Sequence, residues 1–198
     1  MFKRSLIVLL GLLALMAVAY SQSETKKTPE GTAGAASNAA QVKRGQYLVT
    51  VSGCIDCHAP KIFTAKGPEP DPALFLSGAP ANTKLGDLPA NFIGPNAWGA
   101  VCTNDMTTWV GPWGVSFAAN LTPDEATGIG SWTEDSFVQS IRTGKHMGSG
   151  REILPPMPWP MYRNMTDQDL KAIFAYLKSL KPVTNEVPQP IPPAAAAH

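Results

Sequence analysis

The pentapeptide Cys54-Ile55-Asp56-Cys57-His58 is the feature that most limits what this chain can become. Two thiols at this spacing can each add to a vinyl group of one haem, and the histidine that follows can reach the iron. A single turn of chain places both sulfurs at one edge of the porphyrin. The motif therefore predicts one covalently attached haem c, held by Cys54, Cys57 and His58, with His58 as an axial ligand of the metal.

Two other chemistries use cysteines in a similar way. A thioredoxin-like redox pair needs a strand–helix–strand setting, which the sequence around Cys54 lacks. A zinc site could draw on Cys54, Cys57, Cys102 and His146, but no second closely spaced pair completes it. The odd count of three cysteines also argues against a framework of disulfides. We therefore favour haem over these alternatives.

The first residues have the pattern of an export signal. Lys3 and Arg4 give a positive start, residues 6–19 form an apolar run, and Ala17-Val18-Ala19 offers small residues for cleavage. We expect residues 1–21 to be a signal peptide and the mature chain to be periplasmic. An uncleaved membrane anchor is the alternative, although the run is shorter than the ~20 residues that span a bilayer.

Composition favours a single domain rich in loops. The chain has 198 residues, 44% of them hydrophobic, with 19 prolines and 17 glycines, which suits one core and short helices. Without residues 1–21, 14 basic and 15 acidic residues remain, so nothing favours nucleic acid as a partner. This balance also gives little electrostatic steering toward a redox partner.

Three segments have helical signals. The first covers residues 41–52, has Tyr47, Leu48 and Val51 near one face, and leads directly to the motif. The second begins after the cap Thr133 and stops at Gly144. The third begins after the cap Thr166 and ends before Pro182. Its apolar stripe is formed by Leu170, Ile173, Phe174, Leu177 and Leu180.

Polar and proline-rich segments surround these helices. Residues 22–40 are predicted to be a flexible linker and residues 182–198 a disordered Pro/Ala tail, since neither offers enough apolar surface to bury. Residues from about 61 to 117 have no helical period and are expected to form an irregular insertion. Its Cys102 has no obvious mate, and we expect it to be buried as a small hydrophobe rather than exposed for pairing.

A haem that only carries electrons normally has a second axial ligand. The segment Pro155-Pro156-Met157-Pro158 offers a thioether between prolines that stiffen the backbone, so we expect Met157 to be that ligand. Met161 is the second choice. His146 would instead give a bis-histidine site.

The order of helix, C-x-x-C-H motif, loop, helix, Pro-Met-Pro segment and closing helix resembles class I cytochrome c over residues 41–181. Residues 120–124, 128–133 and 156–159 resemble bacterial cytochrome domains that occur alone or as subunits of periplasmic dehydrogenases. The resemblance implies an all-α cytochrome c fold around one haem, with His58 and Met157 as axial ligands. It also implies a close crossing of the first and last helices at Gly45 and Val49, with Phe174, Tyr176 and Leu177 on the crossing surface.

These predictions describe a monohaem c-type cytochrome that carries single electrons between periplasmic or membrane-bound redox proteins and is not itself an enzyme. One alternative is an electron-transfer subunit of a periplasmic dehydrogenase complex. Others are a haem enzyme or gas sensor with an open sixth position, and an interaction module without haem. Membrane association is expected only if the N-terminal segment is not cleaved.

Overall fold

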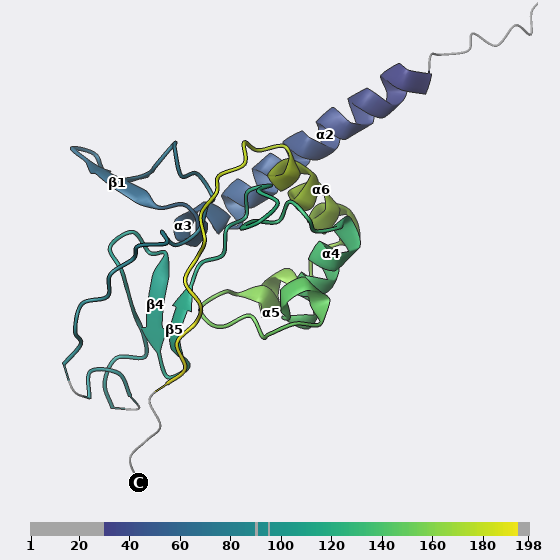
Figure 1. The fold of residues 1–198 in the computed structure, drawn as a ribbon. Coiled ribbons are helices and arrows are strands. Elements are labelled where there is room, and N and C mark those ends of the chain that lie inside the picture. The colour runs from purple at the N-terminus through teal and green to yellow at the C-terminus, as the bar shows by residue number, and fades with distance from the viewer. Residues whose placement is uncertain (1–29, 90, 95, 194–198) are drawn as a thin grey trace, which may run out of the picture. The chain divides into compact units, whose positions relative to one another are not determined.

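The computed structural model describes residues 30–89, 91–94 and 96–193 (Figure 1). The predicted signal peptide, residues 1–21, lies outside the described residues, as does the first part of the predicted linker. The chain divides into two units, Met1–Ser37 and Asn38–His198, and the site described below lies in the second. Within the described residues, no helix has both the length and the apolar character needed to cross a bilayer.

The helices lie on either side of the predicted insertion. They are α2 (Glu30–Val51), α3 (Cys54–His58), α4 (Glu134–Thr143), α5 (Trp159–Tyr162) and α6 (Asp167–Lys178), with a 3-10 turn, η1, at His146–Gly148. The predicted caps are confirmed. Thr133 accepts from the backbone N–H of Ser136 at the start of α4, and Thr166 accepts from that of Asp169 at the start of α6. Gly144 ends α4 with φ of 70°, a left-handed conformation that favours glycine.

The helix before the motif begins earlier than predicted. Residues 30–40 are helical, so the prediction of a flexible linker is wrong for these residues. This stretch holds five alanines, whose strong helix propensity outweighs the polar composition on which the linker prediction was based. The predicted apolar face is also only partly correct, because Leu48 and Val49 are buried while Tyr47 and Val51 are exposed.

The first and last helices cross closely at Gly45, as the family resemblance implies. A Cβ atom placed on Gly45 would lie 1.9 Å from the backbone oxygen of Ala172 and 2.7 Å from Cβ of Tyr176. Only a residue without a side chain fits there. Around this crossing, residues of α2, α4 and α6 form the core, among them Val49, Phe137, Ile141, Leu170, Ile173, Phe174 and Leu177.

Substitution Gly45→Ala is therefore expected to lower the free energy of unfolding by about 1–3 kcal/mol, because the new methyl group overpacks the crossing. Denaturant unfolding followed by far-UV circular dichroism measures this change. Gly86→Ala is the matched control, since a Cβ atom there meets nothing within 4 Å. Equal stability of the Gly45→Ala variant and the control would contradict the close crossing.

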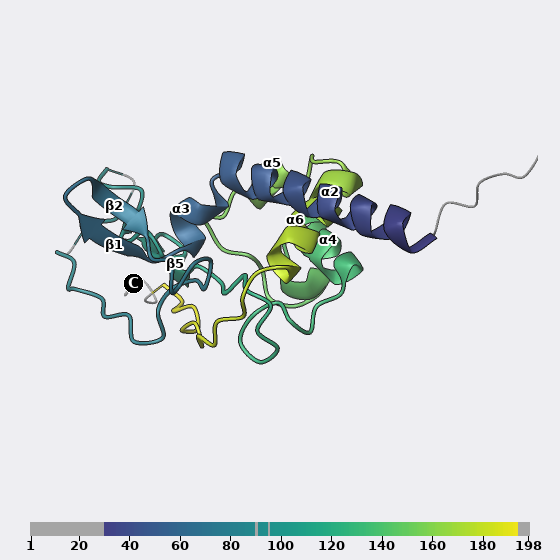
Figure 2. The same cartoon turned by 90° about the horizontal axis from the view of Figure 1, so that it is seen from above.

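The described strands all lie within residues 61–117, the segment predicted to be an irregular insertion. β1 (Lys61–Thr64) and β2 (Gly67–Pro70) form a hairpin, and β3 (Val101–Cys102), β4 (Thr108–Gly111) and β5 (Gly114–Phe117) form an antiparallel sheet. Figure 2 shows this strand-containing part on one side and α4, α5 and α6 on the other. The described residues thus combine helices with two small sheets, and the all-α cytochrome c fold stays a prediction.

The segment after α6 is ordered as far as the structure describes it. Residues 182–193 run in extended conformation past β5, where Ile191 and Val115 exchange two backbone hydrogen bonds of 2.7 and 3.0 Å (Figure 1). The prediction of a disordered tail is wrong for these residues. The side chains of Asn120, Thr122 and Thr127 also form hydrogen bonds with the backbone of Val183 and Asn185, and composition alone does not reveal such partners.

Candidate functional site

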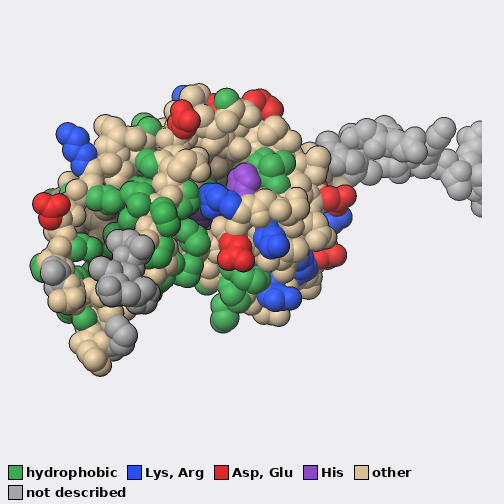
Figure 3. Space-filling model, turned by 60° about the horizontal axis from the view of Figure 1, so that its bottom comes forward, with side chains coloured by type: hydrophobic (Ala, Val, Ile, Leu, Met, Phe, Trp, Pro, Cys, Tyr) green, Lys and Arg blue, Asp and Glu red, His purple; other side chains and the backbone are tan. Residues whose placement is uncertain are grey.

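A cavity of about 630 Å³ lies between the helices and the three-stranded sheet of the second unit. One wall is apolar and comes from the inner faces of α4 and α6, with Phe137, Ile141, Leu170, Ile173 and Leu177. In the space-filling view of Figure 3, hydrophobic side chains gather beside a histidine and basic side chains. This volume and this apolar lining are typical of a site that encloses a small molecule.

The two cysteines of the motif both line this cavity. The preceding Gly53 has φ of 70°, which turns the chain sharply from α2 into the single turn of α3. Cys54 and Cys57 are free thiols. Burial raises the pKa of Cys54 to about 11 and also raises that of Cys57, so both are protonated at neutral pH. The sulfurs are therefore neutral, adjacent and directed to one site.

His58 is buried at the end of α3, and its side chain also lines the cavity. Its Nδ1 lies 2.8 Å from the backbone oxygen of Ala119. A carbonyl can only accept, so Nδ1 carries the proton and Nε2 keeps its lone pair in the neutral ring. Burial, with a smaller effect of the Lys61 ammonium, lowers the pKa of His58 and favours this neutral form. Such a histidine is suited to bind a metal through Nε2.

Met157 lines the same cavity and is half-buried. The loop that carries it is tied to β5, because the hydroxyl of Ser116 donates to the backbone oxygen of Pro155 at 2.6 Å. Met161, the second choice from sequence, is 72% exposed and is absent from the lining. His146 does reach the cavity, where its ring contacts Trp132 edge-on at 4.9 Å between centroids. The structure thus brings together Cys54, Cys57, His58 and Met157.

Cys102 is exposed, so the expectation that it is buried is wrong. It lies on β3, a two-residue strand at one edge of the three-stranded sheet, where its side chain is exposed to solvent. Within the described chain, no three His, Cys, Asp or Glu side chains group as ligands of a metal ion. The zinc site considered from the sequence is thus not assembled by these residues.

The segment after α6 forms a strap, residues 186–190, that lines the cavity. Asn185 anchors its first end. The side-chain Nδ2 of Asn185 donates to the backbone oxygens of Ser77 and Ala79 at 2.8 and 2.9 Å, and its Oδ1 accepts from the N–H of Ala81 at 3.0 Å. The pairing of Ile191 with Val115 anchors the other end. The strap is thus held on both sides of the cavity wall that it forms.

Substitution Asn185→Ala is expected to lower the free energy of unfolding by about 1–3 kcal/mol, because two buried carbonyls lose their donor. It should also expose the cavity, which limited proteolysis after residue 181 would detect. Gln189→Ala is the control, since no side-chain hydrogen bond of Gln189 is found within the described chain. If Asn185→Ala behaved like this control in both measurements, the strap would not be held as described.

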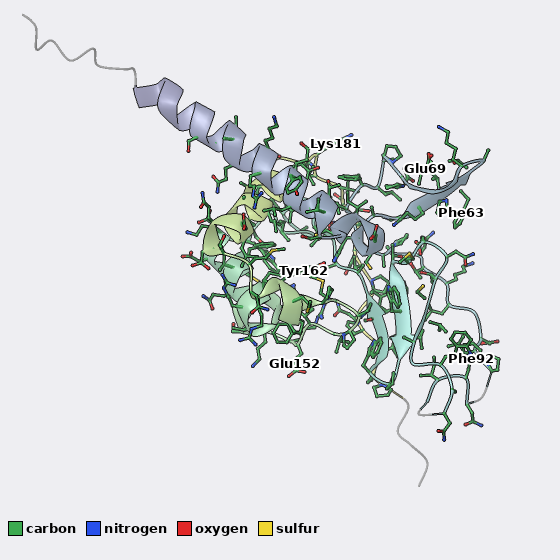
Figure 4. The ribbon with its side chains drawn as sticks, turned by 180° about the vertical axis from the view of Figure 1, so that it is seen from behind. Phe63, Glu69, Phe92, Glu152, Tyr162 and Lys181 are labelled. Carbon is green, nitrogen blue, oxygen red and sulfur yellow. The ribbon has the colours of Figure 1, made fainter. Side chains whose placement is uncertain are left out.

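Several residues of the site gave no signal in the sequence. Tyr162 on α5 lines the cavity and donates to the backbone oxygen of Ser52, just before the motif (Figure 4). Burial, the main cause, raises the pKa of Tyr162 to about 12. Trp109 on β4 also lines the cavity. No spacing in the sequence links Tyr162 or Trp109 to the motif.

No protein-family model matches the chain. It is 28% identical over 197 residues to the gluconate 2-dehydrogenase cytochrome c subunit of Pantoea cypripedii, a match that covers 96% of this chain and 33% of the relative. It is 25% identical over 172 residues to the cytochrome c subunit of the quinone alcohol dehydrogenase of Gluconobacter oxydans, covering 86% and 26%. A diheme c-type cytochrome of Cereibacter sphaeroides is 27% identical over 157 residues, covering 79% and 41%.

The chain therefore spans between about a quarter and two fifths of the length of these relatives. All three are c-type cytochromes by name, and two are cytochrome subunits of dehydrogenases. These similarities support the interpretation of the chain as a cytochrome c that takes part in electron transfer.

Proposed function

We propose that the chain is a monohaem c-type cytochrome that carries single electrons in the periplasm, with a class I cytochrome c fold around its haem. The observation that carries the proposal is the joint presence of Cys54, Cys57, His58 and Met157 in the lining of one largely apolar cavity. The two thiols could attach a haem covalently, and the imidazole with its free nitrogen and the thioether could bind the haem iron. The residues present thus fit the group.

In this proposal Cys54 and Cys57 would hold the haem by thioether bonds, and His58 and Met157 would bind its iron. When bound, the haem supplies an iron that alternates between Fe(III) and Fe(II). The backbone oxygen of Ala119 fixes the ring orientation and tautomer of His58 through Nδ1. Ser116 restrains the loop that carries Met157 through the oxygen of Pro155. The apolar side chains of α4 and α6 exclude water from the site.

A single haem is proposed because the sequence holds one C-x-x-C-H motif and only one further cysteine, Cys102. The diheme relative is longer than this chain, which covers 41% of it, so its second haem has room elsewhere.

A second candidate is an electron-transfer subunit of a dehydrogenase complex. The names of the relatives from Pantoea cypripedii and Gluconobacter oxydans favour this role. In either role the chain exchanges electrons with a redox protein and performs no catalysis of its own. The two roles differ in whether the partner stays bound, which co-purification from the source cell distinguishes.

A haem enzyme or gas sensor differs from an electron carrier in that the sixth coordination position of its iron is open to a small ligand. Protein matured in a host that attaches haem c should show a methionine-to-iron band when oxidised, reversible one-electron reduction, and no rapid binding of carbon monoxide when reduced. Rapid carbon monoxide binding at neutral pH, without the methionine band, would contradict the proposal.

A further inference from the structure

Lys61 is the first residue of β1, three positions after His58, and its side chain folds back over the end of α3. Its ammonium group donates to the backbone oxygens of Asp56 at 2.8 Å and of Ile55 at 3.1 Å, and also to that of Ala59. A fourth contact of 3.4 Å reaches the oxygen of Asp105 in the turn between β3 and β4. An ammonium has three protons, so these contacts use its full donor capacity.

This arrangement fixes a positive charge at a defined place. The last carbonyls of a helix have no partner within it and carry partial negative charge, which a cation at that end offsets. Here the helix is the single turn that carries both cysteines and His58. The side chain of Lys66, on the same hairpin, has no hydrogen bond in the described part of the chain. Lys61 is thus distinguished from an ordinary surface lysine by its contacts and by its partial burial.

We propose that Lys61 is a positioning residue whose fixed charge, held at the end of the haem-attachment helix, raises the reduction potential of the bound haem. The inference rests on the proposed function. A nearby positive charge disfavours Fe(III), which carries one more positive charge than Fe(II), so reduction becomes easier. Loss of the ammonium would also leave the carbonyls of Ile55, Asp56 and Ala59 without their counter-charge. Their partial negative charge favours Fe(III), so this loss too would lower the reduction potential.

Other charges face this group. Asp56 on α3 and Asp105 in the β3–β4 turn are both close enough to favour the charged form of Lys61, against the burial that is the main cause of its lowered pKa. Asp105 itself is held by Thr103 and Thr107, whose hydroxyls donate to its two carboxylate oxygens at 2.6 and 2.9 Å. These carboxylates offset part of the electric field of the ammonium, so the expected effect of Lys61 on the reduction potential is modest.

The test uses the haem-loaded full chain with Lys61→Met, Lys61→Gln and Lys61→Arg. The Met and Gln variants are expected to lower the equilibrium constant for reduction by about three- to tenfold, where tenfold corresponds to about 59 mV for one electron. The Arg variant keeps the charge and should stay close to the wild-type potential. Lys66→Gln is the control on the same hairpin and should change the potential little. Redox titration followed in the visible spectrum measures all five proteins.

The possible outcomes separate the two claims. If the wild-type protein carries no covalent haem, the proposed function fails. If haem is attached and the Gln variant keeps the wild-type potential, or if Lys66→Gln shifts it equally, the role of Lys61 is refuted while the cytochrome stands. If the Met variant does not assemble, the Gln and Arg variants still test the role of Lys61. A purely structural role predicts that the potential does not depend on whether residue 61 is charged.

Discussion

Replacement of Cys54 and Cys57 together by alanine is expected to yield a protein without covalently bound haem. The thioether bonds require both sulfurs, and no other cysteine lines the cavity. Denatured protein extracted with acid–acetone should then lose all visible absorbance, whereas the wild-type protein keeps it. The expected loss of absorbance is complete rather than partial.

Cys102→Ala is the matched control for this experiment, because Cys102 is an exposed thiol outside the cavity lining. Its absorbance after extraction should equal that of the wild-type protein. If the double variant kept its haem through extraction, or if the Cys102 variant lost it, the assignment of the attachment site would be wrong.

The second large effect is expected for Met157→Ala. Without the thioether, the sixth position of the iron opens, and the reduced protein should bind carbon monoxide rapidly. The reduction potential should fall by on the order of 100 mV, since a thioether favours Fe(II) and axial ligands tune haem potentials over about 0.8 V. The methionine-to-iron band of the oxidised protein should disappear. Stopped-flow mixing with carbon monoxide and a redox titration measure these changes.

Met161→Ala serves as the control for this substitution, because Met161 lies four residues away and is 72% exposed. It should keep the band, the potential and the slow reaction with carbon monoxide. If the band persisted in the Met157 variant and disappeared in the Met161 variant, Met161 would be the ligand instead of Met157. Persistence in both would point to another methionine, with Met165 as the next residue of the cavity to test.

The sequence predicted the parts of this molecule that have local signals. α4 and α6 follow from a cap, an apolar stripe and a stop, and the structure confirms both caps and the glycine end of α4. The C-x-x-C-H motif can be recognised in the sequence because its chemistry needs residues that are close together in the chain. The flanking prolines favour Met157 over Met161 as a ligand, and of these two residues only Met157 lines the cavity.

The parts that the sequence did not predict depend on contacts between distant segments. Residues 182–193 look disordered by composition, yet Asn185 binds backbone groups more than 100 positions away. Cys102 was expected to be buried because of its residue type, but exposure on an edge strand depends on which strands pair. Lys61 gave no signal, since the carbonyls that it binds become neighbours only when α3 and the β3–β4 turn are folded.

The packing of the strand-containing part also could not be predicted from the sequence. Figure 4 shows Phe63 on the β1–β2 hairpin and Phe92 in the segment before β3, both away from the helices. Trp98 is 63% exposed and stacks on Phe92 at 5.9 Å between ring centroids. An aromatic residue in a loop therefore predicts a packing contact but does not predict that the residue is buried in the core.

The most direct test of covalent haem attachment is the intact mass of the wild-type chain, produced in a host competent to attach haem c. A monohaem cytochrome should have a mass above that of the processed polypeptide by one haem, with the added mass on the proteolytic peptide that contains Cys54 and Cys57. A mass equal to the bare polypeptide, or haem on any other peptide, would contradict haem attachment at these two cysteines.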